Sequence, residues 1–350
     1  MQASQGATHI CDPADACDSS YRCFLGPTAS TPPTTPAGAK IASDLNFVPN
    51  NSAIHLKNGK SQIYGIIIPD LTNPFFTELV KIFEELLVEN EQEMLVANSD
   101  FHPISAQRSV RRMLLRRVDG VAMLSSELES ASVDSLIRNR IPVVTTDHYR
   151  IANGLSDIKV DFSSGFGLMI AHLKALGHRQ VGFIGGTDGL VTSRVRRESF
   201  LDAIVKQGLS SREEWMQFGN FEIDGGSSAM EKILALTEIP TAIVTANDLT
   251  AIGALRTAHE KGLSIPNDIS ICGCDDIEMS DIVYPPLTTL RIPRQEYARM
   301  LFDALQSAAK DMNQPGHQYR LPVQLVVRQS TGPVPAPGHQ RGGSATRKIR

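Results

Sequence analysis

Cysteine is scarce in this sequence, and the positions of the few cysteines exclude a disulfide framework. The 350-residue chain has five, and Cys272 and Cys274 are only two residues apart on one face of an expected strand. Cys11, Cys17 and Cys23 form no CxxC pair and have no fourth ligand nearby, so we interpret them as free thiols rather than a zinc site. We therefore expect a protein of a reducing compartment, the cytoplasm, that holds neither a metal nor a cofactor.

Long apolar runs and catalytic motifs are also absent. No stretch approaches the roughly 20 apolar residues that span a bilayer, and there is no secretory h-region. The sequence contains no GxSxG motif and no P-loop, and no serine or cysteine is paired with a plausible base. The one tight carboxylate pair, Asp275 and Asp276, occupies consecutive strand positions that face opposite ways. We expect neither a membrane protein nor an enzyme.

Basic residues are not in excess, which limits where nucleic acid could bind. Lys and Arg total 34 and Asp and Glu total 38, so the formal net charge at pH 7 is -4. Any contact with DNA must therefore come from a local patch. Residues 1–38 contain a single basic residue, Arg22, and include the stretch PTASTPPTTPAG, whose composition cannot bury enough apolar surface to fold. We expect this segment, and the tail at 334–350, to be disordered.

From Ile63 onwards, short β-branched runs alternate with longer runs of helical period. Strands are predicted at Ile63–Ile68, Met94–Asn98, Gly120–Leu124, Pro142–Thr146, Val181–Gly186, Trp215–Gly219, Thr241–Ala246 and Ile269–Cys274. Helices are predicted at Pro74–Asn90, Ile104–Arg116, Val133–Asn139, Gly165–Leu176, Ser193–Gln207, Gly226–Leu236 and Leu249–Lys261. Two such series predict an α/β fold of two doubly wound parallel-sheet lobes, in which ligands bind beyond the carboxyl ends of the strands.

Polar side chains gather at those strand ends. Asp147, Asn247 and Asp275 each follow a predicted strand, and PDLTNPFF follows the first. Carboxylates and amides can hydrogen-bond adjacent hydroxyls, and the rings of Phe75, Phe76 and Phe221 can cover apolar sugar faces, so the set suits a small polyhydroxylated ligand. The alternative for each single Asp or Asn is a helix N-cap, and the recurrence at several strands favours the binding site.

Five segments resemble signature segments of the LacI/GalR family of transcription regulators, in the same order. They are GIIIPDLTNPFF (65–76), LKALGHRQVGFIGG (173–186), TAIVTANDLTAIGAL (241–255), GCDDIEMSDIVYPPLTTLR (273–291) and LVVRQSTGP (325–333). The resemblance covers about 39–333 and implies an effector-binding core at 61–333, similar to periplasmic sugar-binding proteins. It implies a first lobe at about 62–161 and 292–318, and a second at about 162–291 and 319–333, joined by a hinge.

The same resemblance implies an effector cleft with residues from both lobes. The implied effector-binding residues are Asn73, Phe75, Phe76, Asp147, Arg196, Phe221, Asn247 and Asp275. Arg196 lies in TSRVRRESF, which matches a family segment whose arginine grips the ligand; the alternative is a solvated helix arginine like its neighbours. The chain departs from the family at Ser199, often glycine, and at Cys274, often aromatic, which bears on the ligand's pose.

Residues 39–60 resemble the end of a DNA-binding domain followed by a hinge helix. The implied DNA-binding hinge residues are Asn50, Asn51, Ala53 and Leu56, with Leu56 as the apolar wedge in a minor-groove base step. The alternative is a plain linker with Leu56 packed on the core. Residues 1–38 show no pattern of a helix-turn-helix reading head, so we expect the head to be missing or replaced and DNA binding to be weak and non-specific.

Two functional hypotheses follow. The first is a cytoplasmic, homodimeric regulator in which a sugar-like effector shifts the lobes and the hinge helices, with operator DNA as a partner if an intact reading head exists. The second is a sugar-binding or sensing protein that does not bind DNA.

Overall fold

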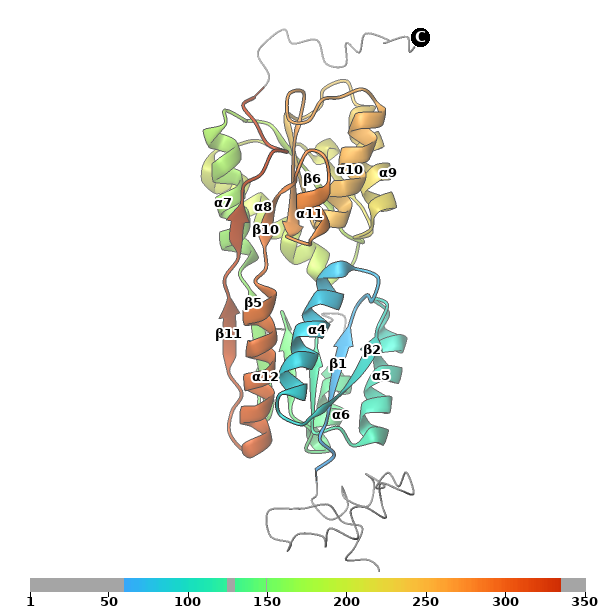
Figure 1. Cartoon of the computed structure of the whole chain (residues 1–350). Coiled ribbons are helices and arrows are strands. Elements are labelled where there is room, and N and C mark those ends of the chain that lie inside the picture. Colours follow the sequence, from blue (N-terminus) through green and yellow to red (C-terminus); the bar gives the residue numbers. More distant parts are fainter. Residues whose placement is uncertain (1–59, 125–129, 149, 335–350) are drawn as a thin grey trace, which may run out of the picture. The chain divides into compact units, whose positions relative to one another are not determined.

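The computed structural model describes residues 60–124, 130–148 and 150–334 (Figure 1). The chain divides after Ser61 into two units, and every helix and strand given below lies in the second, Gln62–Arg350. The predicted hinge residues and the segment at 1–38 expected to be disordered lie outside the described residues, as does the expected disordered tail at 334–350 apart from Val334. No helix in the described part of the chain is long and apolar enough to cross a bilayer.

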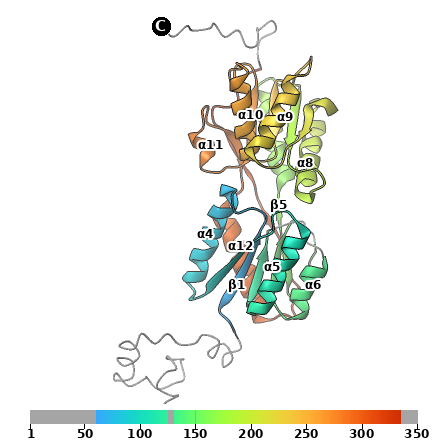
Figure 2. The ribbon, with the colours of Figure 1, turned by 90° about the vertical axis from the view of Figure 1, so that its right-hand side faces the viewer.

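The first sheet contains six parallel strands in the order β11-β5-β4-β3-β1-β2. In chain order they are β1 (Ile63–Ile68), β2 (Glu93–Asn98), β3 (Gly120–Met123), β4 (Val143–Thr146), β5 (Leu155–Val160) and β11 (Gln318–Leu321). One face is covered by α5 (Pro103–Arg116) and α6 (Ser130–Arg138), which lie together in Figure 2. The other face is covered by α4 (Pro74–Val88) and α12 (Arg294–Lys310), which pack against each other.

The second sheet has the order β12-β10-β9-β8-β6-β7 and is parallel except for the β10–β12 pair. Its strands are β6 (Val181–Gly185), β7 (Met216–Phe218), β8 (Ala242–Thr245), β9 (Ser270–Asp275), β10 (Thr288–Arg291) and β12 (Gln324–Val326). Helices α7 (Phe162–Ala175) and α8 (Val191–Gln207) pack together, as do α9 (Ile223–Leu234) and α10 (Asp248–Glu260). The short α11 (Met279–Ile282) follows β9.

The chain passes between the two sheets three times, after β5, after β10 and after β11. Because β11 pairs with β5, residues 319–321 belong to the first sheet, although the resemblance had assigned them to the second lobe. The two doubly wound sheets confirm the predicted fold class.

All the strands and helices predicted from Ile63 onwards are present, with ends that shift by a few residues. Strands β5, β10, β11 and β12 and helices α11 and α12 were not predicted. The sequence of β5, LSDIKV, did not predict a buried strand because it contains Asp157. This residue is fully buried, and its carboxylate accepts hydrogen bonds from the Thr145 hydroxyl (2.8 Å) and the His148 N–H (3.0 Å). Helix α12 has a clear signal, since Tyr297, Leu301 and Leu305 repeat at helical spacing and are all buried.

Candidate effector pocket

A pocket lies between the carboxyl ends of the two sheets, and all eight predicted effector residues line it. Asn73, Phe75, Phe76 and Asp147 come from the first sheet's side, and Arg196, Phe221, Asn247 and Asp275 from the second. The empty space of the pocket, including the part that opens to solvent, is about 730 Å³. The residues that the strand ends and the family resemblance indicated therefore lie around one pocket.

Arg196 is the central polar group of the pocket, and the alternative of a solvated helix arginine is wrong. Helix α8 brings it to a position where the residue is only 9% exposed. Its guanidinium donates to the carbonyl of Ala246 and to Oδ1 of Asp275 (3.3 Å). The rings of Phe162 and Phe221 lie 4.5 and 5.7 Å from its central carbon. Its buried Nε has no hydrogen-bond partner within the described residues, so the guanidinium is not fully satisfied by the protein.

The two carboxyl groups of the pocket are held in unusual surroundings. Burial raises the pKa of Asp147 to about 7; the nearby Asp157 adds to the rise, and a hydrogen bond from the Val160 N–H opposes it. Burial also raises the pKa of Asp275 to about 7, although the positive charge of Arg196 opposes the rise. Near neutral pH each group can therefore exist as a hydrogen-bond acceptor or as a donor, which suits ligand hydroxyls.

Burial and the neighbouring carboxylates have opposite effects on the pKa of the Arg196 guanidinium. Burial alone would lower its pKa, but Asp275 and Asp147 hold the pKa above its ordinary value. The guanidinium therefore stays charged, and the pocket offers a ligand one permanent positive charge together with two carboxyl groups that can gain or lose a proton near neutral pH.

The two pocket asparagines are helix N-caps, as the alternative interpretation proposed. Asn73 Oδ1 accepts the N–H of Phe75 at the start of α4 (3.0 Å). Asn247 Oδ1 accepts the N–H of Thr250 at the start of α10 (3.0 Å), and its amide donates to the carbonyl of Phe221 (2.8 Å). Capping and lining the pocket are not exclusive here, because a helix that starts at a strand's carboxyl end places its cap at the same edge.

Several pocket residues have backbone conformations that are uncommon for non-glycine residues. Phe101, Asp147, Phe221 and Asp275 have φ values of 50°, 52°, 67° and 119°. Such conformations cost on the order of 1–3 kcal/mol each and persist only where the surrounding structure enforces them. The two consecutive aspartates at this point have different surroundings. Asp275 lines the pocket, whereas the carboxylate of Asp276 binds Arg291 (2.6 Å) and Arg328 (2.7 Å).

Comparison with known proteins relates this pocket to a family. A family model described as a periplasmic binding protein-like domain matches residues 170–331. The crystal structure of a LacI transcriptional regulator from Rhodococcus has a TM-score of 0.70 and 25% identity, and the match covers 78% of this chain and 100% of that one. A LacI family regulator from Enterococcus faecium, solved with bound ribose, has a TM-score of 0.69 and 26% identity over 78% of this chain and 99% of its own.

Two curated relatives decide the assignment. The HTH-type transcriptional repressor PurR of Actinobacillus pleuropneumoniae is 35% identical over 248 residues, which cover 70% of this chain and 73% of that protein. The repressor of the same name from Glaesserella parasuis is 31% identical over 304 residues, which cover 85% and 89%. The chain belongs to the LacI/GalR family. Its relatives are transcriptional repressors, which confirms the expectation that it is not an enzyme.

Sequence analysis of this LacI/GalR chain missed several pocket residues. Phe101 follows β2 in the loop to α5, and its ring stacks on that of Phe221 with centroids 5.7 Å apart. Tyr297, on the unpredicted α12, forms a 2.5 Å hydrogen bond with Thr146. The departures from the family at Ser199 and Cys274 concern residues that are buried but do not line the pocket.

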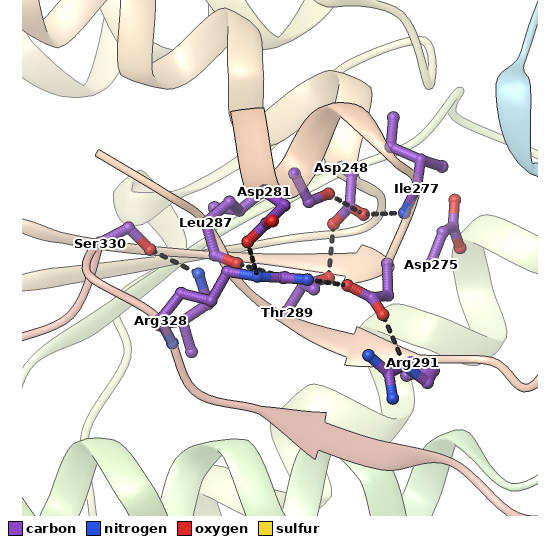
Figure 3. Close-up of polar contacts among 12 residues, drawn as sticks. Asp248, Asp275, Ile277, Asp281, Leu287, Thr289, Arg291, Arg328 and Ser330 are labelled. Atoms are coloured by element: carbon purple, nitrogen blue, oxygen red, sulfur yellow. Dashed lines mark hydrogen bonds and ion pairs between the residues drawn. The ribbon is translucent and has the colours of Figure 1, made fainter. Parts of the chain in front are cut away.

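A second polar cluster lies near Asp275 (Figure 3). The fully buried carboxylate of Asp248 accepts from the hydroxyls of Ser280 (2.6 Å) and Thr289 (2.5 Å) and from the Ile277 N–H (2.9 Å). Arg328 binds both Asp276 and Asp281, the latter at 3.0 Å. This cluster fixes the segment after β9, and so fixes the strand end that carries Asp275.

Proposed function

We propose that this chain is a transcriptional regulator whose state is set by a small sugar or sugar derivative bound in the pocket between the sheets. The observation that carries the proposal is the buried guanidinium of Arg196, which lines the pocket together with Asp147 and Asp275, is not fully satisfied by the described residues and is flanked by the rings of Phe162 and Phe221. Carboxyl groups, a guanidinium and ring faces together match the hydroxyls and apolar faces of a sugar. The ribose bound to the Enterococcus faecium relative supports the same ligand class.

The regulatory consequence is a shift between arrangements of the two lobes. A ligand held by groups from both sheets binds one arrangement better than another, and only that difference in affinity can change the protein's state. The proposal assigns the response to a cytoplasmic homodimer, with the hinge residues Asn50, Asn51, Ala53 and Leu56 as the part that contacts operator DNA.

A thermal-shift panel of sugars, nucleosides and purines tests the pocket. A ligand at about 100 times its Kd stabilises the folded state by about 2.7 kcal/mol, which corresponds to a rise in Tm on the order of 5 °C. Arg196→Ala should abolish the rise. Arg197→Ala is the matched control, because Arg197 is next on α8 and only pairs with Glu213 (3.3 Å). A panel without any shift, or an equal loss in both variants, would contradict the proposal.

A further inference from the structure

The exposed face of α5 carries an unusual concentration of arginine. Arg108, Arg111, Arg112, Arg116 and Arg117 are all exposed, and Arg138 and Arg140 are exposed at the end of the neighbouring α6. We call these seven residues the arginine surface. It stands against a chain whose formal net charge is -4, so it is a local feature and not part of a generally basic protein.

The arginine surface has no charge partner within the described residues. None of its seven guanidinium groups takes part in an ion pair with a carboxylate there. The hydrogen bond from Arg112 to the Ser109 hydroxyl (3.4 Å) is a weak local contact. Within the described residues, these arginines therefore do not stabilise the fold through ion pairs.

The helix itself gains little from these charges. Arg116 and Arg117 end α5 and interact favourably with its dipole, but Arg108 and Arg112 lie too far from the end to benefit. Arg108, Arg112 and Arg116 also stand at i, i+4 spacing, where like charges destabilise a helix by about 0.2–0.5 kcal/mol per pair. An arrangement that costs stability within the chain points to a partner outside it.

The position of the surface indicates which partner. Asp119, two residues after Arg117, accepts the Gln62 N–H through Oδ2 (2.8 Å) and donates its own N–H to the Ile63 carbonyl (2.7 Å). The basic end of α5 therefore adjoins the place where the chain enters the first sheet from residues 1–61. In a family of transcriptional repressors, that preceding segment is where the resemblance places the DNA-contacting hinge.

We propose that the arginine surface binds the phosphate backbone of duplex DNA without reading its sequence. Guanidinium groups pair bidentately with phosphate, and several of them along one helix can follow one strand of a duplex. Ile104 and Leu115, at 53% and 73% exposure, are the exposed large apolar residues of α5, and scattered exposed apolar residues are ordinary. The role is independent of the effector pocket, because α5 contributes no residue to it.

The test is the salt dependence of DNA binding by the full chain. Fluorescence anisotropy with a labelled 30-bp duplex of arbitrary sequence, in 25–200 mM KCl, gives Kd and the slope of log K against log salt. Each lost phosphate contact lowers the magnitude of that slope by about 0.9. The triple variant R108Q/R111Q/R112Q should lower it by 2 to 3 and weaken binding about tenfold or more at 50 mM KCl.

The matched control is R194Q/R256Q/R299Q, which removes the same charge from exposed arginines elsewhere in the core. It should keep the wild-type slope. An unchanged slope in the α5 variant, or an equal loss in the control, would overturn the proposal. So would a loss confined to poly-glutamate binding, which would assign the surface to an acidic protein. Both variants should stay folded and keep any effector shift, so this result is separable from the fate of the pocket.

Discussion

The buried pair of Arg196 and Asp275 predicts an asymmetric response to losing either partner. The two side chains are 11% and 4% exposed, and the charged atoms are 3.3 Å apart. Removing one partner of a buried pair usually costs about 3–5 kcal/mol because the other charge is left uncompensated. Here the two remaining groups differ in whether they can become neutral.

In Asp275→Ala the guanidinium of Arg196 stays charged, because no accessible pH deprotonates it. The carbonyl of Ala246 and the rings of Phe162 and Phe221 still contact it, which places the expected loss near the lower limit, at about 3 kcal/mol. The loss should be smaller at pH 8 than at pH 6 by roughly 1 kcal/mol, because the raised pKa of Asp275 destabilises the wild type as the pH rises through about 7 and the variant lacks this group.

In Arg196→Met the remaining Asp275 can take up a proton. Its pKa is already raised to about 7, so at pH 6 it is mostly neutral in the wild type, and Arg196→Met should change stability by no more than about 1 kcal/mol. At pH 8 the variant must hold a proton that the wild type releases, which costs roughly 1 kcal/mol more, at about 1.4 kcal/mol per pH unit.

Urea denaturation of the wild type, both single variants and the double variant at pH 6 and pH 8 measures these differences and the coupling energy. A loss in Arg196→Met at pH 6 as large as that in Asp275→Ala would refute the reasoning. Equal behaviour of Arg196→Met at both pH values would refute it as well.

Three further predictions concern stability alone. Burial raises the pKa of Asp147 from 3.8 to about 7, so between these pH values the folded state binds more protons than the unfolded chain, and stability falls as the pH rises. Asp147→Asn should flatten this fall between pH 4 and 7. In urea titrations at pH 8 the variant should be more stable than the wild type by roughly 1 to 2 kcal/mol. Asp248→Ala should lose about 3 kcal/mol in the same titration, since it leaves three buried donors unpaired. Gly253→Ala should lose about 2 kcal/mol because its Cβ would meet the backbone of α9, whereas Gly167→Ala, with open space around its Cβ, should gain about 0.5 kcal/mol, as Tm measurements would show.

The sequence predicted the layered architecture because most of the strands are short, largely apolar runs that alternate with segments of helical period. In β1, β3 and β4 the burial is almost continuous, and the sequences IYGIII, GVAM and VVTT contain no charged residue. Strand β5 shows the limit of this reasoning. Its buried Asp157 reads as a surface residue, and only the pairing with Thr145 and the His148 N–H explains it.

The pocket was predictable to the extent that it follows from topology. Asp147, Asn247 and Asp275 sit where strands end, and that edge is determined once the sheets are parallel. Arg196 follows from the family resemblance alone, because its burial depends on tertiary contacts with Ala246, Asp275 and the Phe221 ring that the sequence does not reveal. Phe101 had no signal in the sequence, since its place depends on a loop conformation with positive φ.

The segment after β9 joins the pocket to the passages between the sheets. Arg294, at the start of α12, donates to the carbonyls of Asp275 and Asp276 (both 2.9 Å) and pairs with Glu78 on α4 (2.8 Å). Arg291 ends β10 and holds the Asp276 carboxylate, so the second passage is tied to this strand end on both sides. Asp275 shares a peptide bond with Asp276, so a ligand that shifts the backbone at Asp275 would also shift Asp276. The contacts that would have to change are then those of Arg291 and Arg294, at the point where the chain leaves one sheet for the other.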